Sequence, residues 1–281
     1  MAQILDGIIV KDKIAERLKE EFKKLRPIPT LAIIQVGDDP RSNAYIKRKI
    51  TFGEMIGAKV EHLKYPTDIS TRELVSIVEN KNIDPLTHGI IIQLPLPKHL
   101  NPDEVIGIIS PLKDVDGLTP TNQDNLSRKK PTLVPATARG IITLLDYYKI
   151  PIEGRKVVVV GRSPLVGRPT SLLLESRGAQ VTVCHRETKD LAHETQQADI
   201  LVVAVGKRDL IDKRHVSPRQ IVIDVGINAE DGKITGDTVF DEVKDIVRAI
   251  TPVPGGIGPM TVASLFENLL SAYKKTEITP Q

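Results

Sequence analysis

A phenol and an amine, Tyr45 and Lys49, stand four residues apart in a segment with helical periodicity. Residues at this spacing project from the same face of a helix, so the two side chains share one patch, with Ser42 one turn earlier. Both groups can transfer protons, which makes the patch a candidate catalytic site. The alternative is that they are ordinary surface residues, because the same segment carries several other cations: Arg41, Lys47 and Arg48.

Gln93 comes at the end of a predicted strand, immediately before the break Leu94-Pro95-Leu96-Pro97. Proline cannot continue a central strand, and side chains at the carboxyl ends of parallel strands meet ligands. Gln93 is therefore a second candidate, although a buried glutamine can also simply cap a strand end.

Two carboxylates, Asp114 and Asp116, lie close together before Gly117. Calcium is excluded by the spacing, because no further oxygen ligands or distal glutamate follow. A turn at Asp116-Gly117 is the structural interpretation. The functional interpretation is a carboxylate that reaches a polar, heterocyclic ligand.

Glycine marks two more candidate sites. The valine run 156–160 ends at Gly161 and Gly167 follows, which predicts a strand, a phosphate-binding turn and a helix over 169–177 whose first amides face an anion. The spacing is not G-x-G-x-x-G, so an ordinary strand-turn-helix stays open. Gly255 and Gly256 lie among prolines, which favours a stiff ligand wall including Pro254 over a flexible linker.

The elements that must position these residues alternate along the chain. Strand patterns cover 31–36, 59–65 and 89–94, and helix patterns cover 10–25, 41–56 and 71–81. This alternation is typical of a parallel sheet. Residues 101–135 are rich in proline and predict a loop and domain edge.

A second series follows a helix predicted over 137–148. Strands are expected at 156–160, 180–184, 200–205 and 220–225, then a glycine- and proline-rich loop over 249–259 and a last helix over 261–273. The predicted fold class is α/β, with two α/β domains, the second a doubly wound Rossmann-type parallel sheet.

Composition narrows the function. The chain has 281 residues, a formal net charge of +3 and nine aromatic side chains, five Tyr and four Phe, which argues against a nucleic-acid partner. No apolar run is long enough for a membrane helix and no leader pattern opens the chain, so we expect a cytoplasmic protein. The single cysteine, Cys184, predicts a small buried residue at a strand end. No metal is expected, because the histidines lack metal-ligand spacing, and no G-x-S-x-G elbow is present.

Six motifs follow one another along the chain: Ser42-x-x-Tyr45-x-x-x-Lys49, Gln93-Leu-Pro-Leu-Pro97, Asp114-Val-Asp-Gly117, Gly161-Arg-Ser-Pro-Leu-Val-Gly-Arg-Pro169, Asp224-Val-Gly-Ile-Asn228 and Pro252-Val-Pro-Gly-Gly-Ile-Gly-Pro-Met-Thr261. Together, over about residues 3 to 275, they closely resemble the bifunctional methylenetetrahydrofolate dehydrogenase and methenyltetrahydrofolate cyclohydrolase family, often called FolD. Each motif alone is weak, but six in order are specific.

The resemblance implies two reactions on tetrahydrofolate derivatives. NADP-dependent hydride transfer converts 5,10-methylenetetrahydrofolate to 5,10-methenyltetrahydrofolate, and hydrolysis then gives 10-formyltetrahydrofolate. It also implies a homodimer whose protomers bind folate in a cleft between two domains. The folate-binding catalytic domain would comprise residues 1–136 and 261–281, and the NADP-binding domain residues 137–260.

Site roles carried over from the resemblance fall into two groups. Lys49 would be the catalytic lysine, Gln93 its partner, Tyr45 the ring that stacks on the aminobenzoate and Asp116 the pterin contact. Further substrate contacts would come from Pro254, Gly255 and Gly256, and cofactor contacts from Gly161, Arg162, Ser163, Gly167, Arg186 and Ile227.

Cofactor choice has evidence of its own in the sequence. About 20 residues after Gly161, where an acidic residue would bind an unphosphorylated ribose, stands Cys184-His185-Arg186. Arg162 and Arg186 suit a 2′-phosphate, which favours NADP over NAD. Glu187 is the neighbour that argues the other way.

The chain departs from the usual family pattern in two places. Pro135-Ala-Thr-Ala138 stands where Pro-Cys-Thr-Pro is common, and Asp124 stands in a region that usually has a glycine. Neither departure falls on the four proposed catalytic positions, so we expect activity to be kept.

Two other functions are considered. A short-chain dehydrogenase also uses a Tyr-x-x-x-Lys pair, but there the glycine-rich turn precedes the pair, whereas here Lys49 comes before Gly161. A nucleotide-sensing protein without catalysis is the other alternative, and the presence of Lys49, Gln93 and Asp116 argues against it.

Overall fold

The computed structural model describes residues 2–230 and 233–278. The chain divides into two compact units, which are described separately: unit 1 contains residues 1–12 and 137–261, and unit 2 contains residues 13–136 and 262–281. The sequence-based division assigned residues 1–12 to the folate-binding domain. In the structure their strand pairs within unit 1.

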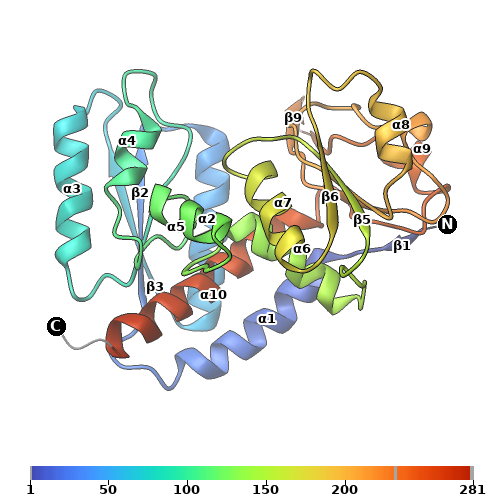
Figure 1. The fold of residues 1–281 in the computed structure, drawn as a ribbon. Helices are drawn as coiled ribbons and strands as arrows, with labels where there is room; N and C mark the ends of the chain where they lie inside the picture. The colour runs from blue at the N-terminus through green and yellow to red at the C-terminus, as the bar shows by residue number, and fades with distance from the viewer. Residues whose placement is uncertain (1, 231–232, 279–281) are drawn as a thin grey trace. The chain divides into compact units, whose positions relative to one another are not determined.

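Unit 1 is built on a six-stranded parallel sheet (Figure 1). Its order is β6 (Gln180–Cys184), β5 (Lys156–Val160), β7 (Ile200–Val203), β8 (Ile221–Asp224), β11 (Ala249–Ile250) and β1 (Gln3–Ile4). Helices α6 (Ala136–Tyr147) and α7 (Gly167–Ser176) lie on one side of the sheet, and α8 (Leu191–Gln196) and α9 (Phe240–Val243) on the other. A 3-10 turn (Lys213–His215) and an antiparallel ribbon of β9 (Asn228–Glu230) and β10 (Lys233–Thr235) complete the unit.

The strand order of unit 1 places its ligand-binding edge. Strand β5 lies between β6 and β7 in the sheet. The chain passes from β5 to β6 on one side and then crosses back to β7 on the other side. The carboxyl ends of β5 and β7 therefore form the switch point at which such sheets bind ligands. Buried valine and leucine side chains on these strands belong to the core, as the sequence predicts for strands covered on both faces.

Unit 2 has a three-stranded parallel sheet in the order β3 (Lys59–Tyr65), β2 (Thr30–Val36) and β4 (Gly89–Ile92), extended by a single bridge from Ile90 to Asp114. Helices α2 (Pro40–Ile56) and α3 (Thr71–Ile83) lie on opposite sides of β2 (Figure 1). All seven residues of β2 are buried. Helix α1 (Gly7–Phe22) and helix α10 (Ile257–Ile278) each begin in unit 1 and continue in unit 2.

Local sequence signals fix the ends of α2, the helix that carries the tyrosine and lysine. The Asp39 side chain accepts a hydrogen bond from the Ser42 N–H, Pro40 occupies the first turn, and Gly57 ends the helix with φ of 83°. A carboxylate N-cap and a proline in the first turn are common at helix starts, and a glycine in the left-handed conformation is common at helix ends. The helix is thereby fixed in register, which decides which side chains face the sheet.

The structure confirms the predicted α/β class, and strands 59–65, 156–160 and 180–184 have the predicted bounds. The prediction of a loop over 101–135 is wrong in part, because α4 (Pro102–Gly107) and α5 (Pro120–Ser127) lie there. Each begins with proline in its first turn and has a polar cap, Asn101 or Thr119. The loop predicted over 249–259 is likewise shorter, since β11 precedes it and α10 starts at Ile257.

The two family departures are accommodated locally. Ala136 and Ala138 are buried at the start of α6. Asp124 lies on α5 and forms an ion pair of 2.8 Å with Arg128. The Asp124–Arg128 ion pair does not involve Lys49 or Gln93. Among the described residues, no helix is both long and apolar enough to span a membrane.

Candidate active site

Lys49 and Gln93 form the centre of the site in unit 2. Nζ of Lys49 donates a hydrogen bond of 3.0 Å to Oε1 of Gln93, and Nε2 of Gln93 donates one of 2.8 Å to the carbonyl of Leu94. The second bond fixes the amide orientation, because only the nitrogen can donate. Gln93 thus presents its oxygen to the lysine, as the proposed partnership requires.

Helix α2 delivers Lys49 from its inward face. Ser42, Ile46, Phe52 and Gly53 are buried on the same helix, and Lys49 itself is only 7% exposed. The interpretation of Lys49 as an ordinary surface residue is therefore wrong. A Cβ on Gly53 would lie 2.4 Å from a methyl of Val60, so the helix sits close against β3 at this point.

Burial sets the protonation of the site. Desolvation lowers the pKa of the Lys49 ammonium, and the nearby charge of Asp116 opposes this effect. Desolvation also raises the pKa of Asp116, helped by the neighbouring charge of Asp114 and opposed by Lys49. Both shifts favour the neutral forms, because removal from water penalises charge. A lysine in this setting can accept a proton nearer neutral pH than a solvated one.

Asp116 is held by a turn that the sequence predicts at Asp116-Gly117. Gly117 has φ of 71° and its N–H donates to the backbone carbonyl of Asp114 at 3.1 Å. The Asp114 carboxylate, 1% exposed, accepts hydrogen bonds from Gly117 N, Thr119 N and Asn122 Nδ2 at 2.8 to 2.9 Å. Asp114 therefore shapes the turn.

A residue that the sequence analysis missed anchors the same turn from α10. Asn268 is fully buried, and its Nδ2 donates to the carbonyls of Val115 and Val134 at 2.8 and 2.7 Å. The Asp116 carbonyl accepts from the Ala136 N–H at 3.2 Å. No motif marks Asn268, because its two acceptors lie more than a hundred positions away in sequence.

Tyr45 is half-buried on α2, one turn before Lys49. Burial raises the pKa of its phenol, and the Arg48 guanidinium, 5.5 Å from the ring centroid, opposes this. The phenol is therefore protonated at neutral pH. A neutral ring with one covered face is suited to stacking against another flat group.

The glycines of the predicted cofactor site lie at the switch point of unit 1. Gly161 has φ of 122°, and a Cβ there would lie 2.3 Å from the carbonyl oxygen of Ala204 after β7. A Cβ on Gly167 would lie 2.1 Å from the carbonyl oxygen of Gly161. Only glycine permits this close approach, so the turn is compact.

The expectation that the first amides of the following helix face an anion is not met. Ser163 Oγ accepts hydrogen bonds from the N–H groups of Val166 and Gly167, both at 3.3 Å, and the Ser163 carbonyl accepts from Arg168 N at 3.0 Å. Pro169 has no N–H to offer. Exposed cationic side chains beside this turn include Arg162 at its start and Arg186 after β6.

Two buried carboxylates, not predicted from sequence as site residues, shape the loops after β7 and β8. Oδ2 of Asp237 accepts from Val205 N and Gly206 N, both at 2.8 Å, and its Oδ1 accepts from Asn228 Nδ2 at 2.9 Å. Asp224 accepts from Gly226, Asp237 and Thr238 N–H groups. These loops carry two exposed apolar side chains, Val205 and the predicted cofactor contact Ile227, 46% and 43% exposed.

Pro254, Gly255 and Gly256 belong to unit 1, whereas Tyr45, Lys49, Gln93 and Asp116 belong to unit 2. The predicted ligand wall, residues 254–256, packs closely against neighbouring backbone. The Gly7 N–H donates to the Gly255 carbonyl at 2.9 Å, and a Cβ on Gly256 would lie 2.6 Å from the Pro252 carbonyl oxygen. This packing agrees with a stiff segment.

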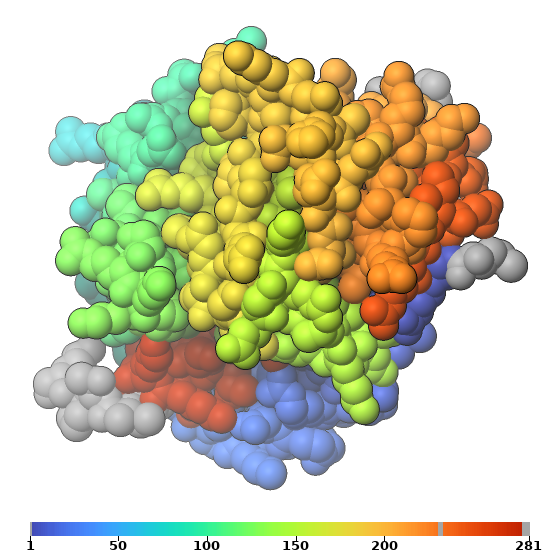
Figure 2. All heavy atoms as spheres, turned by 45° about the vertical axis from the view of Figure 1, so that its right-hand side comes forward, coloured from blue at the N-terminus to red at the C-terminus, as the bar shows by residue number. Residues whose placement is uncertain are grey.

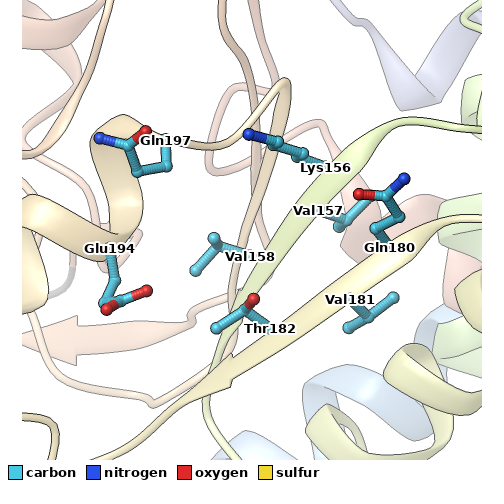
Figure 3. Close-up of a pocket in the computed structure, with 8 residues that line it drawn as sticks. All are labelled: Lys156, Val157, Val158, Gln180, Val181, Thr182, Glu194 and Gln197. Carbon is cyan, nitrogen blue, oxygen red and sulfur yellow. The ribbon is translucent and has the colours of Figure 1, made fainter.

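A separate hollow of about 350 Å³ lies over β5, β6 and α8. Figure 3 shows Glu194 and Gln197 on one side and the strand residues on the other. It contains none of the predicted site residues. Its lining consists of Lys156, Val157, Val158, Gln180, Val181, Thr182, Glu194 and Gln197.

These features define an α/β protein of two units, one with a desolvated lysine and the other with a glycine-lined switch point flanked by arginines. Two family models match the chain: tetrahydrofolate dehydrogenase/cyclohydrolase, catalytic domain, over residues 5–116, and the NAD(P)-binding domain of the same family over residues 135–277. The chain belongs to the tetrahydrofolate dehydrogenase/cyclohydrolase family.

Relatives span the whole chain. The bifunctional protein FolD of Exiguobacterium sibiricum is 44% identical over 277 residues, 98% of this chain and 100% of that protein. The crystal structure of the bifunctional FolD enzyme of Campylobacter jejuni is similar with a TM-score of 0.95 and 41% identity, covering 98% and 100% of the two chains. The Trypanosoma brucei enzyme, complexed with NADP cofactor and inhibitor, has a TM-score of 0.94 and 33% identity, with 99% of each chain covered.

The comparisons confirm the family expected from the six motifs. They support an enzyme with an NAD(P)-binding domain and give no support to a short-chain dehydrogenase or a non-catalytic sensor.

Proposed function

We propose that this chain oxidises 5,10-methylenetetrahydrofolate to 5,10-methenyltetrahydrofolate with NADP and then hydrolyses the product to 10-formyltetrahydrofolate. The observation that carries the proposal is the hydrogen bond from buried Lys49 to Gln93, together with the lowered pKa of the lysine. Family membership supplies the substrate class.

Lys49 serves the hydrolytic step. Water adds its oxygen to the cationic methenyl carbon, and one proton must leave as the carbon–oxygen bond forms. A neutral amine accepts that proton. The carbon–nitrogen bond to N5 then breaks, N5 gains a proton and the remaining hydroxyl loses one, which gives the 10-formyl product. Desolvation lowers the pKa of Lys49, and a cationic substrate nearby lowers it further, so both effects favour the neutral amine.

The other side chains of unit 2 orient the reactants. Gln93 holds the amine through its fixed Oε1, Tyr45 offers a neutral ring for the aminobenzoate, and Asp116 contacts the pterin. The carboxyl group of Asp116 can hydrogen-bond to a polar heterocycle, and burial raises its pKa. Orientation is also what the hydride step needs, since it requires no acid or base.

The residues of unit 1 fit a phosphorylated dinucleotide. Gly161 and Gly167 give a compact turn at the switch point, Arg162 and Arg186 supply cations, and Ser163 supplies a hydroxyl. Ile227 presents an apolar surface suited to a flat ring. NADP, when bound, accepts the hydride; the protein contributes binding and orientation.

Pro254, Gly255 and Gly256 are the further substrate contacts expected from unit 1. The two glycines let a ligand approach the backbone without meeting a side chain. The hydrogen bond from the Gly7 N–H to the Gly255 carbonyl holds this backbone in place. A side chain at Gly256 would collide with the Pro252 carbonyl.

The active form is a homodimer. Strand β6 is an edge of the parallel sheet, and its Gln180, Thr182 and Val183 side chains are exposed, Val183 by 40%. Exposed sheet edges need cover, which a second copy provides. The yellow segment that contains β6 lies on the surface in Figure 2. Val183→Glu should convert a dimer to a monomer in light scattering, and a monomeric wild type would contradict the assignment.

A single buried cysteine suits the reducing cytoplasm.

One assay tests the two reactions together. NADP and methylenetetrahydrofolate are mixed with the protein, and NADPH formation is followed beside the rise and decay of the methenyl product. We expect NADPH to form and the methenyl compound to decay faster than in buffer. Absence of NADPH formation would remove the dehydrogenase, and decay at the buffer rate would remove the cyclohydrolase.

A further inference from the structure

The carboxyl ends of β5 and β6 bring one carboxylate between two cations. The strands are paired to their last residues, Val160 opposite Cys184, and the Gly161 N–H donates to the Cys184 carbonyl at 2.9 Å. The residues that follow each strand therefore leave the sheet side by side. Arg162 follows one strand, and the segment His185–Thr188 follows the other.

The segment after β6 is a closed turn. The His185 N–H donates to Thr188 Oγ1 at 2.9 Å, and the Thr188 N–H donates to the His185 carbonyl at 2.8 Å. The Glu187 N–H points to Nδ1 of His185 at 3.3 Å. These three bonds fix the backbone from which Arg186 and Glu187 project.

Glu187 occupies the position between the two guanidinium groups. Its Oε2 lies 3.9 Å from Arg162 NH2, and its Oε1 lies 3.6 Å from Arg186 Nε. His185 Nδ1 lies 3.7 Å from Oε2. The side chains of Arg162, Arg186 and Glu187 are 56%, 86% and 61% exposed, so an incoming ligand can reach all three.

The two kinds of charge at this strand end serve different ribose groups. Arginine here pairs with a 2′-phosphate, whereas an acidic side chain accepts a hydrogen bond from an unphosphorylated 2′-hydroxyl. This chain has both within 4 Å of one another. A 2′-phosphate must displace or repel the carboxylate before it can pair with the arginines.

We propose that Glu187 is a specificity-determining residue that weakens the preference of this site for a 2′-phosphorylated nucleotide over its unphosphorylated counterpart. The inference rests on the proposed NADP site. It adds that Arg162 and Arg186 are partly neutralised by this protein's own carboxylate. The pairs are long and exposed, so the effect is modest and falls with ionic strength.

Direct binding tests the proposal without catalysis. Calorimetry with 2′,5′-ADP and 5′-AMP, which differ only in the 2′-phosphate, gives the ratio of the two affinities. Glu187→Gln should raise the affinity for 2′,5′-ADP by about three- to tenfold, without raising that for 5′-AMP. Glu175→Gln, which removes an exposed carboxylate from the far end of α7, should leave the ratio unchanged.

Several outcomes overturn the inference. An unchanged ratio in Glu187→Gln, equal changes for both nucleotides, or a gain that survives high salt would each remove the electrostatic competition. Failure of the cofactor site itself is distinguished by Arg162→Gln. If the wild type binds neither nucleotide, or if this variant does not weaken 2′,5′-ADP, the NADP assignment falls together with the inference drawn from it.

Discussion

Nζ of Lys49 lies 3.0 Å from Oε1 of Gln93, and the Gln93 amide is locked by its second bond to the Leu94 carbonyl. The lysine therefore has a neutral acceptor as its hydrogen-bond partner. A carboxylate in the same position would hold the ammonium charged, because an opposite charge at hydrogen-bond distance favours ionisation. Burial lowers the pKa of Lys49, and the neutral Gln93 does not oppose this effect as a carboxylate would.

Gln93→Glu tests this relationship. The new carboxylate should raise the pKa of Lys49, move the rising limb of the cyclohydrolase pH–rate profile to higher pH, and reduce the rate at neutral pH by about tenfold or more. Gln93→Met is the matched neutral variant, which removes the acceptor without adding charge and should not move the limb upward. A profile for Gln93→Glu that coincides with wild type would show that Lys49 is not the titrating base.

Asp114→Asn tests the turn that presents Asp116. Both oxygens of the buried carboxylate accept hydrogen bonds, three in all, whereas the amide of asparagine has one acceptor oxygen and one donor nitrogen. We therefore expect a loss of about 1–3 kcal/mol in the free energy of unfolding. Urea denaturation measures the loss. Asp68→Asn, at an exposed position, should change the free energy little. Equal effects of the two substitutions would contradict the role given to Asp114.

Asp224 gives the stability of unit 1 a defined pH dependence. Burial, chiefly, raises the pKa of this carboxyl from 3.8 to about 6. Between these values the folded state holds a proton that the unfolded state has released, so stability is greatest below about pH 4 and falls as pH rises to about 6. Asp237, the charged group facing it, adds to the shift.

Asp224→Asn removes this titration. Relative to the variant, wild type should lose up to about 3 kcal/mol of unfolding free energy between about pH 4 and about pH 7. Asp241→Asn, at a position with an 85% exposed side chain, serves as the control and should show no such dependence. A wild-type-minus-variant difference that stays constant across this range would refute the assignment.

The sequence predicts the regular elements best where one local signal dominates. Strand 156–160 is a run of β-branched residues, and its bounds agree with β5. The sequence does not predict helices α4 and α5, because proline usually ends a helix. At the first helical position its missing N–H costs nothing. Strands β1 and β11 have two residues each, too few for any periodicity.

The site was predictable in its residue types but not in its supports. Tyr45 and Lys49 share a face because of their spacing, and Gln93 follows a strand. Asn268 and Asp237 were not predictable, because each bonds groups that only the tertiary fold brings near. The sequence predicts that the first helix amides face an anion, but in the structure the N–H groups of Gly167 and Arg168 donate to Ser163.

Lys49 is the proposed proton acceptor of the hydrolytic step. Lys49→Met keeps a long unbranched side chain and removes the amine. The direct measurement is the rate at which this variant hydrolyses methenyltetrahydrofolate, taken beside its rate of NADPH formation and its affinity for the folate. We predict that enzymatic hydrolysis falls by about a hundredfold or more, while folate still binds and dehydrogenase activity persists in part. Hydrolysis at the wild-type rate would exclude Lys49 as this proton acceptor.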